Sequence, residues 1–394
     1  MIDALDECDG DKNIGIILQL LAEARLLKTV RLRLFLTSRP ETPIQNGFYH
    51  IPGAEHQDFV LHNISSSIIN HDIAIFLEHN LRRTRTAFHL PSGWPSEQEI
   101  AALGKNASGL FIWAATACRF IHAGKRFAAD RLSLVLKRRA PVDDTEEDYS
   151  TDDSVASNGD CMISPEEKLN EIYLAVLQNS VRNYTKDERK RWYKLLRDAT
   201  GTIILLFLPL SAISLARFLN VHEEYIIQTL NDLHSILNIP EVQVLPIRLH
   251  HPSFRDFLLD KSRCGSSKFW VDEKQAHCRL ADSCIRLMST ALKEDICGVH
   301  VPGTLATDVE RNQVDQYLPP EIQYSCLYWI QHLQRSDAQL RDNDYVHQFL
   351  QEHLLHWLEA LSWMQKMPEG ILDIISLESI ALVSLPIIYY RQLN

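Results

Sequence analysis

Hydrophobic and polar positions follow two different periods along this chain, and the period changes near residue 65. Between Asn13 and Lys28, apolar residues recur on one helical stripe, which consists of Ile16, Ile17, Leu20, Leu21 and Ala24. Short apolar runs at 31–37 and 59–61 predict strands. A helix that joins two such runs is the connection that parallel strands require, so the first 64 residues are predicted to form an α/β portion.

From Ser65 onward the apolar spacing is helical, with three- and four-residue steps from Ile68 to Leu81. Ser96 followed by Glu99 is a capping-box signature for the next helix. Buried helical patterns continue over 109–117, and the chain is predicted to be helical from Cys264 to its end. The predicted fold class is therefore mainly α, with a partial N-terminal α/β portion.

Residues 165–263 show a different order of elements. Ser164, Pro165 and the acids that follow them predict a helix start, because they combine a cap, a first-turn proline and negative charge. Helical patterns and then strand-like runs follow, at 191–206, 214–219, 223–233, 242–245 and 247–249. This order predicts a winged-helix domain. Winged helices often bind DNA, but the candidate recognition helix 223–233 carries three acids and no Lys or Arg, which argues against phosphate contact.

Composition and charge limit the class of protein. The 394 residues are 45% hydrophobic and 23% charged, which is ordinary for a globular protein. Most of the net charge of −11 comes from one acidic stretch between Asp143 and Asp160, so residues 141–164 are predicted to be a disordered linker. The remainder is nearly neutral, so bulk nucleic-acid binding is not expected.

Cysteine usage and the apolar runs predict a cytoplasmic protein. Eight scattered cysteines without a Cys-x-x-Cys pair indicate free thiols in a reducing compartment, and the N-terminus lacks a signal-peptide pattern. Proline and charged residues interrupt the most apolar stretches, so no membrane span is expected. His277, Cys278 and Cys284 do not have the spacing of zinc ligands.

The candidate chemistry begins with three carboxylates within five residues: Asp3, Asp6 and Glu7. At the carboxyl end of a buried strand in a nucleotide-hydrolysing fold, the first carboxylate holds Mg²⁺, because that hard cation prefers oxygen ligands. A later carboxylate orients the water that attacks the γ-phosphate. The spacing assigns the first role to Asp3 and the second to Asp6 or Glu7. The alternative is that these acids start a helix, where negative charge suits the dipole.

A second stretch decides between these interpretations. Residues 31–41 form a short apolar strand that ends in Ser38-Arg39-Pro40-Glu41. With the acidic cluster and the helix before it, this stretch resembles the Walker B and sensor 1 region of NACHT NTPases, the signalling ATPases of animal NOD-like receptors and fungal incompatibility proteins. The resemblance implies a P-loop NTPase-type fold for the α/β portion, and a contact from Arg39 to the γ-phosphate.

Two further strings extend the resemblance along the chain. Trp94-Pro95-Ser96 and then residues 109–114 resemble the lid helices of fungal NACHT proteins. His251, within the string His251-Pro252-Ser253-Phe254-Arg255-Asp256-Phe257, matches the family's winged-helix histidine, which reaches the β-phosphate of bound ADP. Asp256 stands where the family pattern has Glu or Asp. The alternative is that His251 only caps or packs locally.

The sequence departs from the family in one respect: it contains no Gly-x-x-x-x-Gly-Lys-Ser/Thr loop to cradle phosphates. Only two residues precede Asp3, whereas a strand of four to eight is expected there. The chain is therefore expected to be a NACHT protein truncated at Walker B. ATP or ADP and Mg²⁺ are the family's ligands, but this chain alone is expected to bind none of them, and its activity as an enzyme stays uncertain.

These inferences define five regions: 1–64 is the C-terminal half of the NTPase core, 65–140 a helical lid, 141–164 the linker, 165–263 a winged helix and 264–394 a helical arm. The predicted function is that of a fragment of a signalling switch. The alternative is a non-enzymatic interaction protein that binds intact NACHT partners through its winged helix and arm. Protein partners, including a second copy of this chain, are expected; nucleic acid and membrane are not.

Overall fold

The structure is a computed structural model that describes residues 1–8, 11–24, 33–39, 42–49, 56–57, 59–137, 164–181, 185–264, 268–301 and 303–384. The chain divides into two units, 1–66 and 67–394. Each unit is described by itself. All but the last residue of the predicted linker 141–164 lies outside the described residues.

The first unit contains a parallel β-bridge between Ile2 and Leu36. Helix α1 (Asp11–Ala24) lies between these two bridged positions in the chain, and α2 (Thr42–Tyr49) follows the second. A small core forms from Leu5, Ile14, Leu18 and Ile44, which are all buried. The bridge is parallel and a helix connects its two sides, as the apolar pattern of the first 64 residues predicts.

Two details of this unit differ from the prediction. The buried face of α1 is rotated relative to the predicted apolar stripe. Ile14 and Leu18 face the core, while Ile16 and Leu20 are 54% and 58% exposed. Residues 59–61 are not a strand: Leu61–Asn63 is a 3-10 helix, and Phe59 is 77% exposed. A strand is stable only when a neighbour completes its ladder of hydrogen bonds, and these residues have no such neighbour in the described part of the unit.

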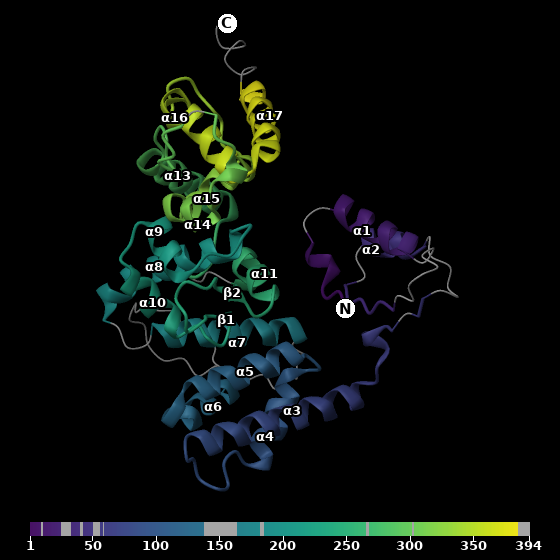
Figure 1. Ribbon diagram of the computed structural model, residues 1–394. Helices are drawn as coiled ribbons and strands as arrows, with labels where there is room; N and C mark the ends of the chain where they lie inside the picture. The colour runs from purple at the N-terminus through teal and green to yellow at the C-terminus, as the bar shows by residue number, and fades with distance from the viewer. Residues whose placement is uncertain are drawn as a thin grey trace, which may run out of the picture. The chain divides into compact units, whose positions relative to one another are not determined.

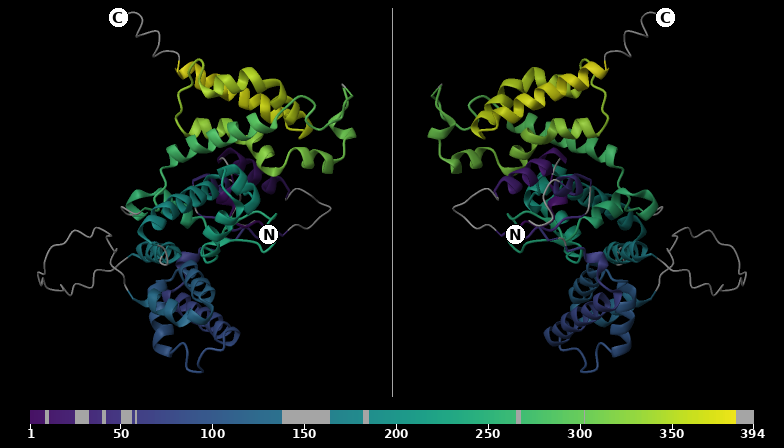
Figure 2. Two further views of the ribbon diagram at one scale, coloured as in Figure 1. Left: turned by 90° about the vertical axis from the view of Figure 1, so that its left-hand side faces the viewer. Right: turned by 90° about the vertical axis from the view of Figure 1, so that its right-hand side faces the viewer.

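The second unit is an array of helices with one small sheet (Figures 1 and 2). Its first helices are α3 (Ser66–Ala87), α4 (Glu97–Ala107), α5 (Phe111–Ala123) and α6 (Ala128–Leu136). The middle part holds α7 (Pro165–Ser180), α8 (Lys186–Leu205), α9 (Ala212–Leu219), α10 (Glu223–Asn231), β1 (Leu237–Asn238), β2 (Arg248–Leu249), α11 (Ser253–Leu259) and α12 (Lys261–Cys264). The last helices are α13 (Glu273–Ala291), α14 (Arg311–Tyr317), α15 (Pro320–Arg335), α16 (Tyr345–Trp363) and α17 (Met367–Ser384).

Helix starts in this unit follow the capping signals of the sequence. The Ser96 side chain accepts the backbone N–H of Glu99 while the Glu99 carboxylate accepts the N–H of Ser96, which is a complete capping box for α4. Ser164 and Glu167 form the same arrangement at the start of α7. Each box satisfies amide groups that the first helical turn leaves without a partner.

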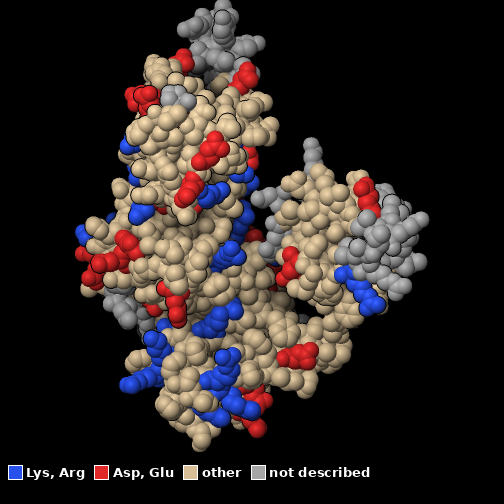
Figure 3. Space-filling model, viewed as in Figure 1, with Lys and Arg blue, Asp and Glu red and all other residues tan. Residues whose placement is uncertain are grey.

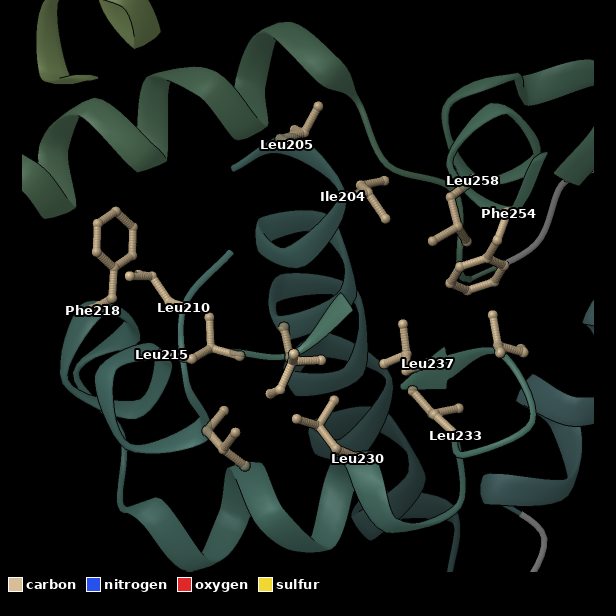
Figure 4. Packing of buried hydrophobic residues seen from close by; sticks show 14 of the residues in the cluster. Ile204, Leu205, Leu210, Leu215, Phe218, Leu230, Leu233, Leu237, Phe254 and Leu258 are labelled. Carbon is tan, nitrogen blue, oxygen red and sulfur yellow. The ribbon is translucent and has the colours of Figure 1, made fainter. Parts of the chain in front are cut away.

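The middle part of the unit buries side chains from α8, α9, α10, β1 and α11 in a common core, as Figure 4 shows. Strands β1 and β2 are antiparallel, with Leu237 opposite Leu249. A further antiparallel bridge joins Ser211 to Pro246. The predicted strand at 242–245 is wrong, because this segment is a turn closed by the bond from the Leu245 N–H to the Val242 carbonyl, at 3.0 Å. Its valines are exposed, so they gain no burial from strand pairing.

The last helices pack around two buried tryptophans. The Trp329 and Trp357 rings meet edge to face, with their centroids 5.6 Å apart. The Trp357 indole N–H donates to the carbonyl of Cys326 at 2.9 Å. Most described residues of the protein are helical and its strands are short, so the prediction of a mainly α fold is confirmed. None of the described helices combines the length and apolar character that crossing a bilayer demands.

Basic side chains are concentrated over α3–α6 on one face of the second unit (Figure 3). Two arginines from these helices donate hydrogen bonds to backbone carbonyls within the unit. Arg119 donates through Nε to the carbonyl of Ser235 at 2.9 Å, and Arg131 donates through Nη1 to that of Phe120 at 2.9 Å. These two side chains therefore hold α5 and α6 in place.

Candidate functional site

The candidate site of the first unit lies where two parallel segments end side by side. The Ile2 N–H donates to the Phe35 carbonyl at 2.9 Å, and the Thr37 N–H donates back to the Ile2 carbonyl at 3.0 Å. Because the two segments run in the same direction, their carboxyl ends meet at one edge. Asp3 follows the first segment, and Ser38 with Arg39 follows the second. The structure thus brings the two predicted motifs together.

Thr37 holds the first of these turns. Its hydroxyl donates to the exposed carboxylate of Asp3 and also accepts the Ala4 N–H at 2.9 Å. Its carbonyl accepts the Leu5 N–H at 3.0 Å. Ala4 itself has φ 51° and ψ 53°, the left-handed conformation, which costs a non-glycine residue about 1–2 kcal/mol. The contacts to Thr37 offset that cost and hold the acidic turn against the second segment.

Asp6 is the residue that ties the two ends together. It lies in a 3-10 helix, Leu5–Glu7. Its Oδ1 accepts the Arg39 N–H at 2.9 Å and the Ser38 hydroxyl at 3.1 Å, and its Oδ2 lies 3.6 Å from Arg39 Nε. The Asp6 side chain is 7% exposed, whereas that of Arg39 is 50% exposed. Both Asp6 oxygens are therefore engaged within the unit.

The charge state of Asp6 follows from these contacts. Burial acts to raise its pKa, but hydrogen bonds from Arg39, its own amide and Ser38, together with the positive charge of Arg39, hold the pKa below its ordinary value. Asp6 is thus a carboxylate at neutral pH.

The available chemistry differs between the three predicted carboxylates. Asp3 is exposed, so its carboxylate is open to a hard cation. The carboxylate oxygens of Asp6 contact Ser38 and Arg39, so in this conformation they are not available to orient a water molecule. Glu7 ends the 3-10 helix, and its side chain lies outside the described residues. Over the described ranges, no cluster of three or more His, Cys, Asp and Glu is placed to bind a metal ion.

His251 lies in the second unit, at the start of α11. Its Nδ1 is 3.2 Å from the backbone N–H of Ser253 and 2.7 Å from the Ser253 hydroxyl. Because Nδ1 accepts a hydrogen bond from an amide, the neutral ring carries its proton on Nε2. The Ser253 hydroxyl is also 2.8 Å from the Tyr173 hydroxyl of α7. His251 is therefore oriented by a chain of hydrogen bonds that reaches another helix.

Burial raises the pKa of Tyr173, although the hydrogen bond with Ser253 and the charges of Arg119 and Arg263 oppose the shift. The phenol consequently stays protonated and serves as a fixed neutral partner for Ser253. The local capping role of His251 is thus present in the structure, through the hydrogen bond from the Ser253 N–H to Nδ1.

Sequence reasoning missed two residues that position these side chains. In the sequence, Thr37 is only the last residue of the predicted strand 31–37, and no role is assigned to Tyr173. The register of the Ile2–Leu36 bridge is the signal that identifies Thr37, because it places the hydroxyl beside Asp3. No local pattern identifies Tyr173, whose partner is 80 residues away.

Comparison with known proteins gives a partial match. No family profile matches the chain. Over 104 residues it is 36% identical to vegetative incompatibility protein HET-E-1 of Podospora anserina. This stretch covers 24% of the present chain and only 8% of that protein. The match supports the resemblance to fungal NACHT-type proteins.

Proposed function

We propose that this chain is part of a NACHT-type signalling switch of the fungal incompatibility kind, and that by itself it neither binds nor hydrolyses ATP. The observation that carries the proposal is the convergence of Asp3, Asp6 and Arg39 at one edge of the first unit. These residues come from motifs separated by more than 30 positions, and a Walker B and sensor 1 pair requires such a convergence. The similarity to HET-E-1 supports the same assignment.

In the proposed switch, Asp3 is the Mg²⁺ ligand, Arg39 the γ-phosphate contact, and Asp6 or Glu7 the group that orients water. His251 contributes a donor to the β-phosphate of ADP. The residues present fit a hard cation and an anion only in part, because Asp3 is open whereas Arg39 is engaged by Asp6. The sequence also offers no glycine-rich loop to cradle the triphosphate, and phosphoryl transfer is mostly a matter of positioning.

Calorimetry on the purified chain with Mg²⁺ and either ATP or ADP tests this proposal. We expect no heat of binding at micromolar ligand. Micromolar affinity would overturn the proposed inactivity. If Asp3→Asn and Arg39→Ala then left that affinity unchanged, the assignment of Asp3 and Arg39 to the nucleotide site would also be wrong.

Whether coding sequence continues upstream of Met1 is tested independently by sequencing transcripts and the genomic region before its codon. An upstream coding segment with Gly-Lys-Ser/Thr supports the fragment proposal. A transcript that starts at this codon would favour the second candidate below.

The second candidate is a non-enzymatic interaction protein, and a specific observation favours it. Helix α17 buries Gly370, Asp373 and Leu377, yet it leaves Leu372 and Ile375 64% and 54% exposed on its outer side. Adding a Cβ to Gly370 would bring it within 2.4 Å of the Leu361 side chain, so close packing on α16 fixes which side of α17 faces outward. Exposed apolar helix faces mark sites of protein association.

This second candidate predicts capture of intact NACHT proteins by the chain, through the winged-helix and arm regions, and loss of capture when Leu372 and Ile375 become glutamate. The winged-helix assignment rests on the order α8, α9, α10, β1 and β2 with the bridge at Ser211. Helix α10 has Glu223 and Glu224 in its first turn, so we propose no role in DNA binding. The cytoplasmic location stays a prediction.

A further inference from the structure

Two fully buried histidines meet between α13 and α15. The Nδ1 atoms of His277 and His332 are 2.8 Å apart, and both side chains are 0% exposed. His332 Nε2 lies 2.8 Å from the hydroxyl of Tyr324, whose oxygen also accepts the backbone N–H of Phe207 at 3.2 Å. Phe207 belongs to the connection 206–211 between α8 and α9. One chain of hydrogen bonds therefore joins this connection to two helices of the arm.

The donors in this chain can be ordered. If Tyr324 donates its O–H to His332 Nε2, then His332 must carry its proton on Nδ1 and donate it to His277 Nδ1. His277 then carries its proton on Nε2. Within the described structure that Nε2 has no hydrogen-bond partner, but the Glu273 carboxylate of the preceding turn lies 3.9 Å away. The opposite order would leave the Tyr324 O–H without an acceptor and an unprotonated nitrogen facing Glu273, so the first order is favoured.

The charged groups around the pair come from three helices. Glu273 belongs to α13, Arg335 to α15 and Arg255 to α11. The Arg335 guanidinium lies 4.6 Å above the Phe207 ring, and the His332 ring centroid is 4.8 Å from that of Phe207. The two arginines therefore disfavour a positive charge on the imidazoles, whereas Glu273 favours one at His277 Nε2.

Two other titratable groups face the chain. Cys284 lies on α13 and Tyr328 on α15, and both act electrostatically on Tyr324. Burial raises the pKa of Tyr324 and of the Cys284 thiol, so both stay neutral. Burial, then Arg335 and Arg255, lowers the pKa of His277 to about 4. Burial, then His277 and Arg335, lowers the pKa of His332 to about 3.

We propose that the hydrogen-bonded chain Phe207–Tyr324–His332–His277 is an acid-sensitive lock that holds the α8–α9 connection on the arm helices. The neutral pair contains one Nδ1 donor and one Nδ1 acceptor. When the neutral His277 ring, which carries its proton on Nε2, takes up a second proton, the proton is added at Nδ1 and turns that atom into a donor that faces the Nδ1–H of His332. His332 can avoid that clash only by moving its proton to Nε2, where it meets the O–H of Tyr324. One added proton therefore reverses the whole chain or breaks it.

The first test measures the proton positions directly. In the full-length chain labelled with ¹⁵N-histidine, and with signals assigned by single His→Gln variants, we expect opposite neutral tautomers at pH 7: Nδ1–H for His332 and Nε2–H for His277. On acidification, both rings should change together at one midpoint. The same tautomer on both rings at pH 7, or a His332 signal that does not change through the His277 midpoint, would overturn the lock.

The second test measures what the lock holds. Hydrogen exchange of peptides that cover 206–211 should accelerate through the same midpoint, while peptides from α4 should not. Tyr324→Phe removes the O–H that blocks Nε2 of His332, so the midpoint should rise by about one pH unit, the size of one hydrogen bond to an ionisable group. Tyr317→Phe, at an exposed tyrosine, is the matched control. The proposal would be contradicted by an unchanged midpoint in Tyr324→Phe. It would also be contradicted by a hydrogen-exchange rate at 206–211 that does not change through the transition.

Discussion

Replacing Asp6 by alanine should strongly destabilise the first unit while the second unit keeps its stability. Asp6 accepts hydrogen bonds from the Arg39 N–H and the Ser38 hydroxyl, and its side chain is 7% exposed. A hydrogen bond to a charged group contributes about 1.5–3 kcal/mol, although donors near the surface regain part of this from water. The ion pair with the half-exposed Arg39 adds at most about 1 kcal/mol. The expected loss is therefore about 2–4 kcal/mol.

That loss is large for the first unit. Stabilities of about 0.05–0.15 kcal/mol per residue correspond to about 3–10 kcal/mol for residues 1–66, and the core described there has only four fully buried apolar side chains. In hydrogen-exchange measurements, the amides of α1 should lose protection in Asp6→Ala, while those of α13 and α15 keep it. Asp6→Asn retains an acceptor oxygen and should show a smaller loss.

Asp3→Ala is the matched control, because Asp3 is exposed and its carboxylate accepts the Thr37 hydroxyl. We expect a change below about 1 kcal/mol for this variant. The pH dependence has a defined sign as well. Since the pKa of Asp6 is lowered in the folded unit, its contribution to stability is complete above the ordinary value of about 4 and is lost as the pH falls below it. Equal effects of Asp6→Ala and Asp3→Ala would refute the structural role of Asp6.

Three other predictions concern the second unit and are measured by urea unfolding. Trp357→Ala should cost about 3–5 kcal/mol, because the ring is fully buried; a loss below about 1 kcal/mol would show that α16 packs differently. The Glu321 carboxylate is 3% exposed and lies 2.7 Å from Arg217 Nη1. Arg217→Met leaves this buried charge without its ion-pair partner and should lower the free energy of unfolding by about 3 kcal/mol. The double variant Arg217→Met/Glu321→Leu should recover most of that loss. Ser164→Ala should cost about 1 kcal/mol through loss of the α7 cap, and Ser164→Asp should restore stability.

Local signals in the sequence identified features that depend on neighbouring residues. Ser96 and Ser164 cap their helices because a capping box needs only the residue three positions on. The parallel arrangement of the first unit was also predictable, since a helix joins its two bridged segments. Residues 59–61 and 242–245 were predicted wrongly because their apolar character says nothing about whether a neighbouring strand is present.

The candidate site was predictable in part for the same reason. The resemblance to the Walker B and sensor 1 region implied a common site for Asp3, Asp6 and Arg39, and the structure brings them together. The sequence did not indicate that both carboxylate oxygens of Asp6 contact Ser38 and Arg39. Long-range contacts of this kind depend on the register of the bridged segments, which no single stretch of sequence encodes.

The uninterrupted buried cluster of the second unit has a mechanical consequence. It runs from Ile73 of α3 through Phe218 of α9 to Trp357 of α16 as one packed cluster of buried side chains. Close-packed interiors have low compressibility and transmit strain, so we expect a displacement of α3 to be passed on to α16 through the side chains of this cluster.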